Sequence, residues 1–272
     1  MPAANPIEVA INFDAISAIM AVGANRASSF MFLGLRSAED ETIRSVRLDG
    51  AYTYQFMPEP LSAEQSKEVR GNFLKWIIGN GLRELDQHFV RALDEAYTLY
   101  VLINAGSTIR MGDLTEQLRP FTNKTNAGDK LETIANAFGA NATLLPHIRS
   151  LAAARNALTH NAGMVSPRHA FGGTALKVRW RGLDISVGDQ TFGETFEPIF
   201  VTAGQEITLA ADDREKIFQI GAEIAFSPHE LHEICLTYII QIDEVKLRAV
   251  DFARTKGLPV TIIPAASALP AS

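Results

Sequence analysis

Residues 61–103 read LSAEQSKEVRGNFLKWIIGNGLRELDQHFVRALDEAYTLYVLI. Ser62 is a residue type that caps helices, and apolar side chains recur after it at helical spacing: Phe73, Trp76, Ile77, Leu82, Leu85, Phe89 and Leu93. We predict one long helix from 62 to about 103, with this stripe facing a core. Gly79 and Gly81 mark either a break or a point of close packing.

The flanking sequence also predicts helices, over 8–35, 131–138, from Pro146 to near Gly163, 212–226 and 229–256. Alternating apolar residues around Asp49-Gly50 predict a hairpin within 42–56, and 175–187 is expected to form a short hairpin. Residues 119–130 form a polar stretch. The expected fold class is mainly α, a helical bundle with one or two small β-hairpin insertions.

We expect residues 1–60 to form an N-terminal helix and a possible hairpin packed on the bundle. Residues 61–257 would form the helical domain, including the hairpin near 175–187. The Ala- and Pro-rich residues 258–272 are expected to be a flexible tail.

Composition narrows the class of protein. The chain has 272 residues, of which 47% are hydrophobic, as is usual for a globular protein. Its one cysteine, Cys235, excludes a disulfide framework and fits a reducing compartment. The start lacks the basic region of a secretory signal, and the apolar run from Ala15 to Ala24 is too short to span a bilayer. We therefore expect a cytoplasmic protein without membrane association.

Charge is unevenly distributed along the chain. The net charge of −6 argues against non-specific coating of nucleic acid, yet no Asp or Glu occurs from Thr133 to Leu183. The same window contains the basic residues Arg149, Arg155, Arg168, Lys177, Arg179 and Arg181, with His147, His160 and His169. Such a window indicates an anion site. The alternative is a solvated surface that happens to lack acids.

The segment RNALTHNAG, residues 155–163, lies inside this window. On a helical wheel Arg155 shares a stripe with the apolar residues Ile148, Leu151, Ala152, Leu158 and Ala162. Because burial of an unpaired charge is costly, Arg155 either pairs with a carboxylate on a neighbouring helix or lines a cleft open to an anion. Both possibilities remain open at this point.

The wheel also separates Arg155 from His160, by about 140°. Asn156 and His160 are four residues apart and share a face, so Asn156 is placed to orient the imidazole. Arg155 and His160 converge only if the helix frays after Thr159 or if a second copy of the chain contributes. A catalytic pair would therefore favour a site at a two-fold interface.

An arginine, a polar residue and a histidine at this spacing in a helical bundle resemble the Arg-x4–6-His signature of the HEPN superfamily. RNALTHNAG is similar to the form found in HEPN proteins of bacterial defence and abortive-infection systems. The resemblance extends over roughly residues 62–250 and is motif-specific over 155–163. It implies a HEPN-like bundle and a metal-independent endoribonuclease acting on single-stranded RNA, as a stress or phage-defence effector.

The resemblance also implies roles. His160 would be the general acid or base, Arg155 would hold the phosphate, and Asn156 would orient His160 or contact the phosphate. The 2′-OH would attack the adjacent phosphate and leave a 2′,3′-cyclic phosphate. The residues expected to track the RNA backbone are Arg149, Arg168, His169, Lys177, Arg179 and Arg181. In 175–187, however, Lys177, Arg179 and Arg181 alternate with Val178 and Trp180, which also fits the solvated side of a half-buried strand.

Spacing alone does not select this site, because Arg83 and His88 have the same spacing in an acid-rich helix. His229 and His232 lie at i and i+3 rather than the i and i+4 of zinc proteases, and we read them as ordinary helix residues. The sequence has no Walker, Rossmann or Ser-His-Asp signature. We expect no cofactor and no metal.

Two hypotheses follow. The first is a homodimeric endoribonuclease with a composite site at the two-fold and a possible antitoxin or defence partner. The second is a non-catalytic HEPN-like helical bundle that acts as a protein- or nucleotide-binding module, with Arg155 in a structural ion pair.

Overall fold

The computed structural model describes residues 11–39, 47–48, 54–55, 62–106, 110–124, 126–139, 142–188, 190–192, 202 and 204–260. Within these ranges the protein is mainly helical, as the sequence predicts, with six helices, a three-stranded antiparallel sheet and a two-stranded pair. Residues 8–10, at the start of the predicted helix 8–35, and residues 261–272 of the predicted tail lie outside the described residues.

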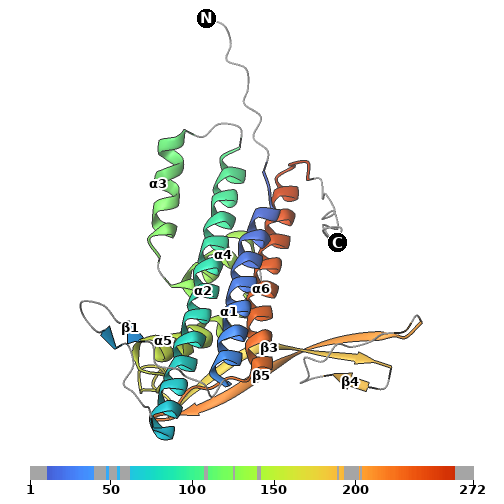
Figure 1. Ribbon diagram of the computed structural model, residues 1–272. Coiled ribbons are helices and arrows are strands. Elements are labelled where there is room, and N and C mark those ends of the chain that lie inside the picture. Colours follow the sequence, from blue (N-terminus) through green and yellow to red (C-terminus); the bar gives the residue numbers. More distant parts are fainter. Residues whose placement is uncertain are drawn as a thin grey trace, which may run out of the picture.

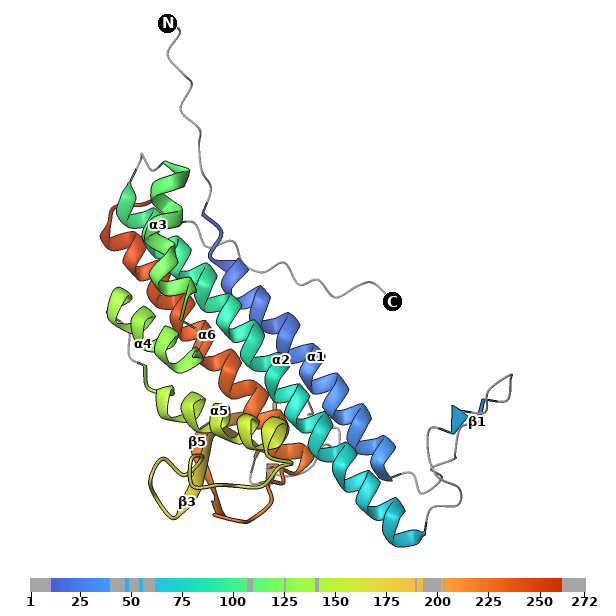
Figure 2. The ribbon, with the colours of Figure 1, turned by 90° about the vertical axis from the view of Figure 1, so that its left-hand side faces the viewer.

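Three long helices form the body of the protein: α1 (Asp14–Glu39), α2 (Ala63–Ala105) and α6 (Pro228–Thr255). They lie side by side (Figure 2). Ser62 caps α2, because its side chain accepts from the Gln65 N–H while the Gln65 side chain accepts from the Ser62 N–H. Ser227 and Glu230 form the same capping box on α6.

Glycines bring α1 and α2 close together. A Cβ at Gly81 would lie 2.4 Å from Met31 Cγ, and one at Gly23 would lie 2.3 Å from His88 Cβ. Both distances are far below ordinary carbon contact, so these positions require glycine at the present helix spacing. The close-packing interpretation of Gly81 is therefore confirmed, and α2 continues through it without a break.

Shorter helices cover one flank of this body: α3 (Met111–Thr122), α4 (Ala127–Phe138) and α5 (Leu145–His160). Asn126 caps α4 by accepting from the Gly128 N–H, and the helix begins at Ala127, four residues before the predicted start. Helix α3 was not predicted, and its end falls in the polar stretch 119–130. Pro120 lies inside the last turn of α3, where a proline in the sequence argues against a helix.

The sheet corrects two predictions. Residues 175–187 do not form a hairpin but a single strand, β3 (Ala175–Val187), which pairs along its whole length with β5 (Ile207–Gln219). Residues 212–219 therefore belong to a strand, where a helix over 212–226 was predicted. The short β4 (Gln190–Phe192) pairs with the far end of β3. Figure 1 shows this ribbon crossing one end of the bundle and extending beyond it.

The predicted N-terminal hairpin is present as two short strands, β1 (Arg47–Leu48) and β2 (Tyr54–Gln55), which pair antiparallel. The turn between them, at Asp49-Gly50, lies outside the described residues.

The core lies between the long helices, α5 and the bundle end of β3. Val178 and Trp180 of β3 are buried, whereas Lys177 and Arg179 between them are exposed. Among the described helices, α1 is long and apolar enough over Asp14–Ala38 to cross a membrane by length and composition, a test that core helices also pass. One face of α1 is buried in the bundle: Ile16, Met20, Ala24, Ala27 and Met31.

Candidate functional site

Helix α5 ends at the motif. Pro146 occupies its first turn, as predicted, and the helix stops at His160, three residues before the predicted end. The backbone N–H groups of Asn161 and Gly163 both donate to the Ala157 carbonyl, and Gly163 has a φ of +80°. Gly163 thus closes the helix end with a backbone conformation that suits glycine. Because the helix ends at His160, Ala162 is exposed and does not extend the apolar stripe.

Arg155 points inward, as the wheel predicts, and meets a carboxylate. Its Nη1 lies 2.5 Å from Asp86 Oδ2 of α2, and its Nη2 donates to Asn156 Oδ1 over 2.9 Å. The Asp86 side chain is 9% exposed and that of Arg155 is 24% exposed. Burial raises the pKa of Asp86, and the charge of Arg155 opposes this shift. The structural ion pair, one of the two possibilities for Arg155, is present.

Asn156 and His160 share one face of α5, but they do not bond to each other in the described structure. Asn156 Oδ1 is bound by Arg155, which leaves the Asn156 Nδ2 donors for another partner. His160 is exposed and makes no hydrogen bond or ion pair within the described residues. Arg155 therefore orients Asn156, whereas the sequence predicts that Asn156 orients His160.

Asn156 and His160 line a pocket of about 580 Å³. Its walls also include Asn126 and three of the residues predicted to bind the RNA backbone: Arg149, Arg168 and His169. Phe171 completes the rim. His160 also lines a second pocket of about 470 Å³, together with Lys75, Trp76 and Arg83. The imidazole thus lies between two hollows that both carry cationic side chains.

The cations of the first pocket differ in their pairing. Arg149 lies 3.0 Å from Glu132 and 3.5 Å from Asp129, both of α4. Arg168 is exposed and forms no ion pair with a carboxylate in the described part of the chain. An incoming anion would meet a neutralised Arg149 and a free positive charge at Arg168.

The loop after α5 holds a histidine in a defined tautomer. His169 is 4% exposed, and its Nδ1 accepts from the Ser166 backbone N–H over 3.0 Å. Burial lowers the pKa of His169, and the nearby charge of Arg168 adds to this. The ring is therefore neutral with its proton on Nε2, which has no partner among the described residues.

Phe171, two residues further on, is exposed and strained. Its side chain is 72% exposed, and its φ of +49° lies in the left-handed region. A bulky residue in this region costs about 1–2 kcal/mol. Gly172 follows with a φ of +83°. The loop therefore presents an aromatic ring at the pocket rim in an unfavourable conformation, a combination that sequence patterns did not indicate.

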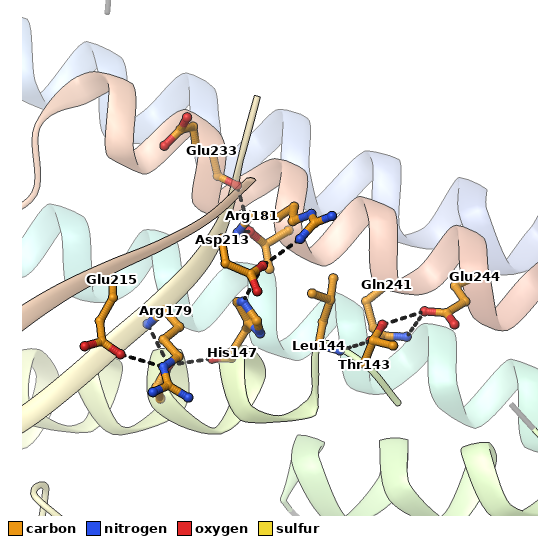
Figure 3. A network of polar contacts seen from close by, with 12 residues as sticks. Thr143, Leu144, His147, Arg179, Arg181, Asp213, Glu215, Glu233, Gln241 and Glu244 are labelled. Atoms are coloured by element: carbon orange, nitrogen blue, oxygen red, sulfur yellow. Dashed lines mark hydrogen bonds and ion pairs between the residues drawn. The ribbon is translucent and has the colours of Figure 1, made fainter. Parts of the chain in front are cut away.

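The three basic residues of β3 lie away from this pocket and face carboxylates of β5. Arg179 Nε is 2.7 Å from Glu215, Arg181 Nη1 is 2.7 Å from Asp213, and Lys177 Nζ is 3.9 Å from Glu215. Figure 3 shows the Arg179 and Arg181 pairs. Lys177 and Arg179 are on the solvated side of a half-buried strand, as the alternative interpretation holds. Because Lys177 and Arg179 share Glu215, the two carboxylates offset two of these three positive charges and weaken their attraction for an RNA backbone.

His147 connects α5 to the same network (Figure 3). Its Nε2 lies 3.2 Å from Asp213 Oδ1, while its buried Nδ1 has no partner among the described residues. Burial lowers the pKa of His147 despite the nearby Asp213. Hydrogen bonding from Arg181 lowers the pKa of Asp213. This network joins α5 to the sheet and is remote from His160.

The remaining candidate residues serve packing. Cys235 is buried, and burial raises the pKa of its thiol to about 12. His229 Nε2 lies 3.1 Å from Glu233, which also accepts from Trp180 Nε1. Within the described residues, no group of three or more His, Cys, Asp or Glu side chains is arranged to hold a metal ion.

Comparison of the chain with models of known protein families, with curated proteins and with solved structures finds no match.

Proposed function

We propose that the protein is a metal-independent endoribonuclease of the HEPN type that cleaves single-stranded RNA, with His160 as its proton-transfer group. The observation that carries the proposal is the common pocket of Asn156, His160, Arg149 and Arg168. An imidazole can transfer protons, and amide and guanidinium donors can stabilise charge on a phosphate, so this set can serve phosphodiester cleavage by an internal hydroxyl.

The chemistry assigns distinct roles. His160 takes the proton of the ribose 2′-OH as its oxygen forms a bond to phosphorus, and the bond from phosphorus to the 5′ oxygen breaks. The Asn156 Nδ2 donors and Arg168 stabilise the charge on the non-bridging oxygens. Arg155 is then a positioning residue, since its guanidinium is held by Asp86 and fixes Asn156 Oδ1.

The leaving 5′ oxygen needs a proton from a second group. His169 is buried and neutral, so within the described pocket His160 is the one exposed imidazole. A second copy of the chain would supply the acid from its own His160, which makes the proposed functional unit a homodimer.

An apolar groove beside His160 supports this dimer. Phe30, Leu33 and Trp76 are more than half exposed and line a pocket of about 440 Å³ between α1 and α2. Trp76 also lines the second His160 pocket, so the groove adjoins the hollow on that side of His160. A two-fold contact along this face would cover the exposed rings and bring two His160 side chains together.

The test is incubation of purified protein with diverse single-stranded RNAs in EDTA. Removal of a general acid or base lowers the rate by about 10²–10⁴-fold, so His160→Ala should abolish cleavage. Arg155→Ala should reduce it, whereas Arg248→Ala, which removes an exposed arginine of α6, should not. RNA with a 2′-deoxy sugar at the scissile position should stay intact. Cleavage that persists in His160→Ala and Arg155→Ala, or a wild type that cleaves no RNA, would refute the proposal.

The dimer has its own test. Trp76→Asp places a charge in the groove without disturbing the core, because Trp76 is 62% exposed. It should shift sedimentation to the monomer and lose cleavage together with it. An excess of His160→Ala should also inhibit the wild type by forming mixed dimers. Full activity of a monomeric Trp76→Asp variant would rule out the composite site.

The Asp86–Arg155 ion pair also supports the alternative function, a non-catalytic protein- or nucleotide-binding module. In that case Arg155 matters for stability alone. The RNA incubation separates the two functions, because a module would bind without producing a 2′,3′-cyclic phosphate.

A further inference from the structure

The three-stranded sheet has two edges, and the chain covers them differently. On the β3 edge, side chains of α5 and α6 accept backbone N–H groups: Arg179 donates to Ser150 Oγ, Arg181 to Thr237 Oγ1 and Leu183 to Glu233 Oε1. The far end of this edge pairs with β4. The β3 edge is therefore closed by hydrogen bonds within the chain. Strand β5 forms the other edge, since the strands lie in the order β4-β3-β5.

The outer edge of β5 has no comparable partners in the described part of the chain. On the side of β3, the Ile220 N–H donates to the Thr174 carbonyl, and the Glu206 carbonyl accepts from the Gly188 N–H. Backbone groups of an antiparallel strand alternate between its two sides, so even-numbered residues of β5 face β3 and odd-numbered residues face outward. From 207 to 217 these outward N–H and C=O groups form no hydrogen bond with a described residue. They are available to a further strand.

This edge also lacks features that commonly prevent strands from pairing. Strand β5 has no proline, and its register with β3 runs without a bulge over Ile207–Gln219. Its Lys216 is held by Glu230 of α6. The odd-numbered side chains Leu209 and Ile217 are more than half exposed. The ribbon extends beyond the bundle (Figure 1), so that a long edge with exposed aliphatic side chains is open to pairing.

The charges of β5 are complementary to each other when two copies run antiparallel. With full overlap of Ile207–Gln219, Asp213 lies at the two-fold axis, and Asp212 lies opposite the second copy's Arg214. Asp212 is exposed and forms no ion pair with a described residue, while Arg214 uses Nη2 for Asp184 and has further donors. Even-numbered residues form the closely spaced pairs of this ladder, so the opposite charges come close together twice.

Apolar side chains match in the same register. Leu209 of each copy lies opposite Ile217 of the other. The two Asp213 side chains meet at the axis, which is unfavourable, but each accepts from Arg181 over 2.7 Å, and this guanidinium offsets its charge. A shift of the pairing by two residues in either direction would place Asp212 or Arg214 opposite itself. Full overlap is therefore the register that the charges favour.

We propose that β5 is a self-association edge, on which the β5 strand of a second copy pairs antiparallel over Ile207–Gln219. The contact joins two three-stranded sheets into one, and it uses up the free edge of both copies. It goes beyond the proposed function, because it lies on the sheet and not in the α1–α2 groove beside His160. Where both contacts form, dimers assemble into larger oligomers. A single pair of strands is a small interface, so this association belongs to high protein concentration.

Cysteine cross-linking tests the register. A mixture of Leu209→Cys and Ile217→Cys proteins under mild oxidation should form a disulfide-linked dimer, because paired Cα atoms lie about 5.5 Å apart in such a ladder. Each variant alone should not, since its two cysteines would be roughly 27 Å apart along the strands. Leu247→Cys on α6 is the matched control for Leu209→Cys, because both leucines are 63% exposed. Cys235 is buried and has a raised thiol pKa of about 12, so it stays unreactive.

Sedimentation over a wide range of protein concentration measures the association without a cross-link. The Trp76→Asp background removes any contribution of the groove. Ala211→Pro deletes an outward N–H and leaves the bonds to β3, so it should abolish the concentration-dependent dimer, whereas Ala211→Thr should keep it. Asp212→Lys makes two attractive pairs repulsive and should weaken association by about tenfold. Asp113→Lys, the same charge change at an exposed position of α3, should have no effect.

Thermal denaturation checks that each variant is folded. A protein that stays monomeric at every concentration, with no more mixed disulfide than the Leu247→Cys control, would overturn the proposal. Disulfides that form as readily within each single variant as in the mixture would refute the register. Dimers that persist in folded Ala211→Pro and Asp212→Lys proteins would assign the association to another surface and equally overturn it.

Discussion

The Asp86–Arg155 ion pair can be dissected by a double-mutant cycle. The two side chains bridge α2 and α5 over a separation of 69 positions in sequence. Asp86→Leu leaves the Arg155 guanidinium without its carboxylate, and Arg155→Met leaves a buried Asp86. The double variant replaces the whole pair with apolar groups of similar size.

Burial sets the expected magnitudes. Removal of one partner from a buried pair costs about 3–5 kcal/mol, and replacement of both partners is often near neutral. Because the Arg155 side chain is 24% exposed, water can partly solvate it after Asp86→Leu. We therefore expect each single variant to lose about 3 kcal/mol and the double variant to recover most of this loss. For a chain of this size that corresponds to a decrease in melting temperature of about 6–12 °C in each single variant.

Urea denaturation of the four proteins measures the coupling free energy. The buried-pair argument would be refuted by single variants that each lose less than about 1 kcal/mol of unfolding free energy. It would also be refuted by a double variant whose loss equals the sum of the two single losses. RNA cleavage by the same proteins distinguishes structure from function. A stable double variant that has lost cleavage means that Arg155 positions the site, whereas one that still cleaves means that Arg155 serves stability alone.

The cycle also has a pH dependence. Burial raises the pKa of Asp86 above 3.8, so the folded state binds more protons than the unfolded state above that pH. Stability from this group is therefore complete below 3.8 and is lost as pH rises through the raised pKa. Arg155→Met removes the charge that opposes the shift. Its destabilisation should be smaller at pH 5 than at pH 8, and a loss independent of pH would contradict the assigned burial of Asp86.

Three further predictions concern stability and reactivity. Gly23→Ala places a Cβ 2.3 Å from His88 Cβ and should cost about 1–3 kcal/mol in denaturation, whereas Gly71→Ala, with nothing within 4 Å, should add up to about 1 kcal/mol. Cys235, whose thiol pKa burial raises to about 12, should react with iodoacetamide only as fast as the protein unfolds. His147 has its pKa lowered by burial, so the folded state binds fewer protons and stability should fall as pH drops below 6.5. His147→Leu should reduce that dependence in denaturation curves measured at pH 5.5 and 7.5.

The helices could be predicted where their signals are local. The α2 prediction rested on a capping residue and a repeating apolar stripe, and both are encoded within the segment itself. The stripe was predicted to face a core, but Phe73 and Trp76 near its start are exposed. The helix prediction for residues 212–219 was wrong because the strand there lacks such local signals. Most of β5 is exposed, and two of its three less exposed positions carry the charged residues Arg214 and Lys216, so the strand shows no alternation of apolar residues and resembles a solvated helix face in sequence. Its conformation depends on pairing with β3, which is distant in sequence, so a local sequence pattern cannot predict it.

The candidate site shows the same division. The inward orientation of Arg155 could be predicted, because a helical wheel uses only the sequence of the helix itself. The partner of Arg155 could not be predicted. It is Asp86, which lies between Arg83 and His88, the second arginine and histidine with the same spacing. Acidic residues make residues 83–88 unsuitable for binding phosphate, and one of these acids, Asp86, holds Arg155 in place. Phe171 escaped notice because its φ of +49° and its place on the pocket rim depend on the folded loop.

The charge around the candidate site differs between the sequence and the folded protein. The window from Thr133 to Leu183 has no acid in sequence, but the fold places acids of β5 and α4 against its cations. A sequence window therefore overstates the positive potential, which depends on neighbours in space. Within the described pocket, Arg168 keeps its charge unpaired, beside His160 and the ring of Phe171. RNA recognition in this pocket would rely on this small set, so that Arg168→Ala should weaken RNA binding more than Arg179→Ala, whose guanidinium lies 2.7 Å from Glu215.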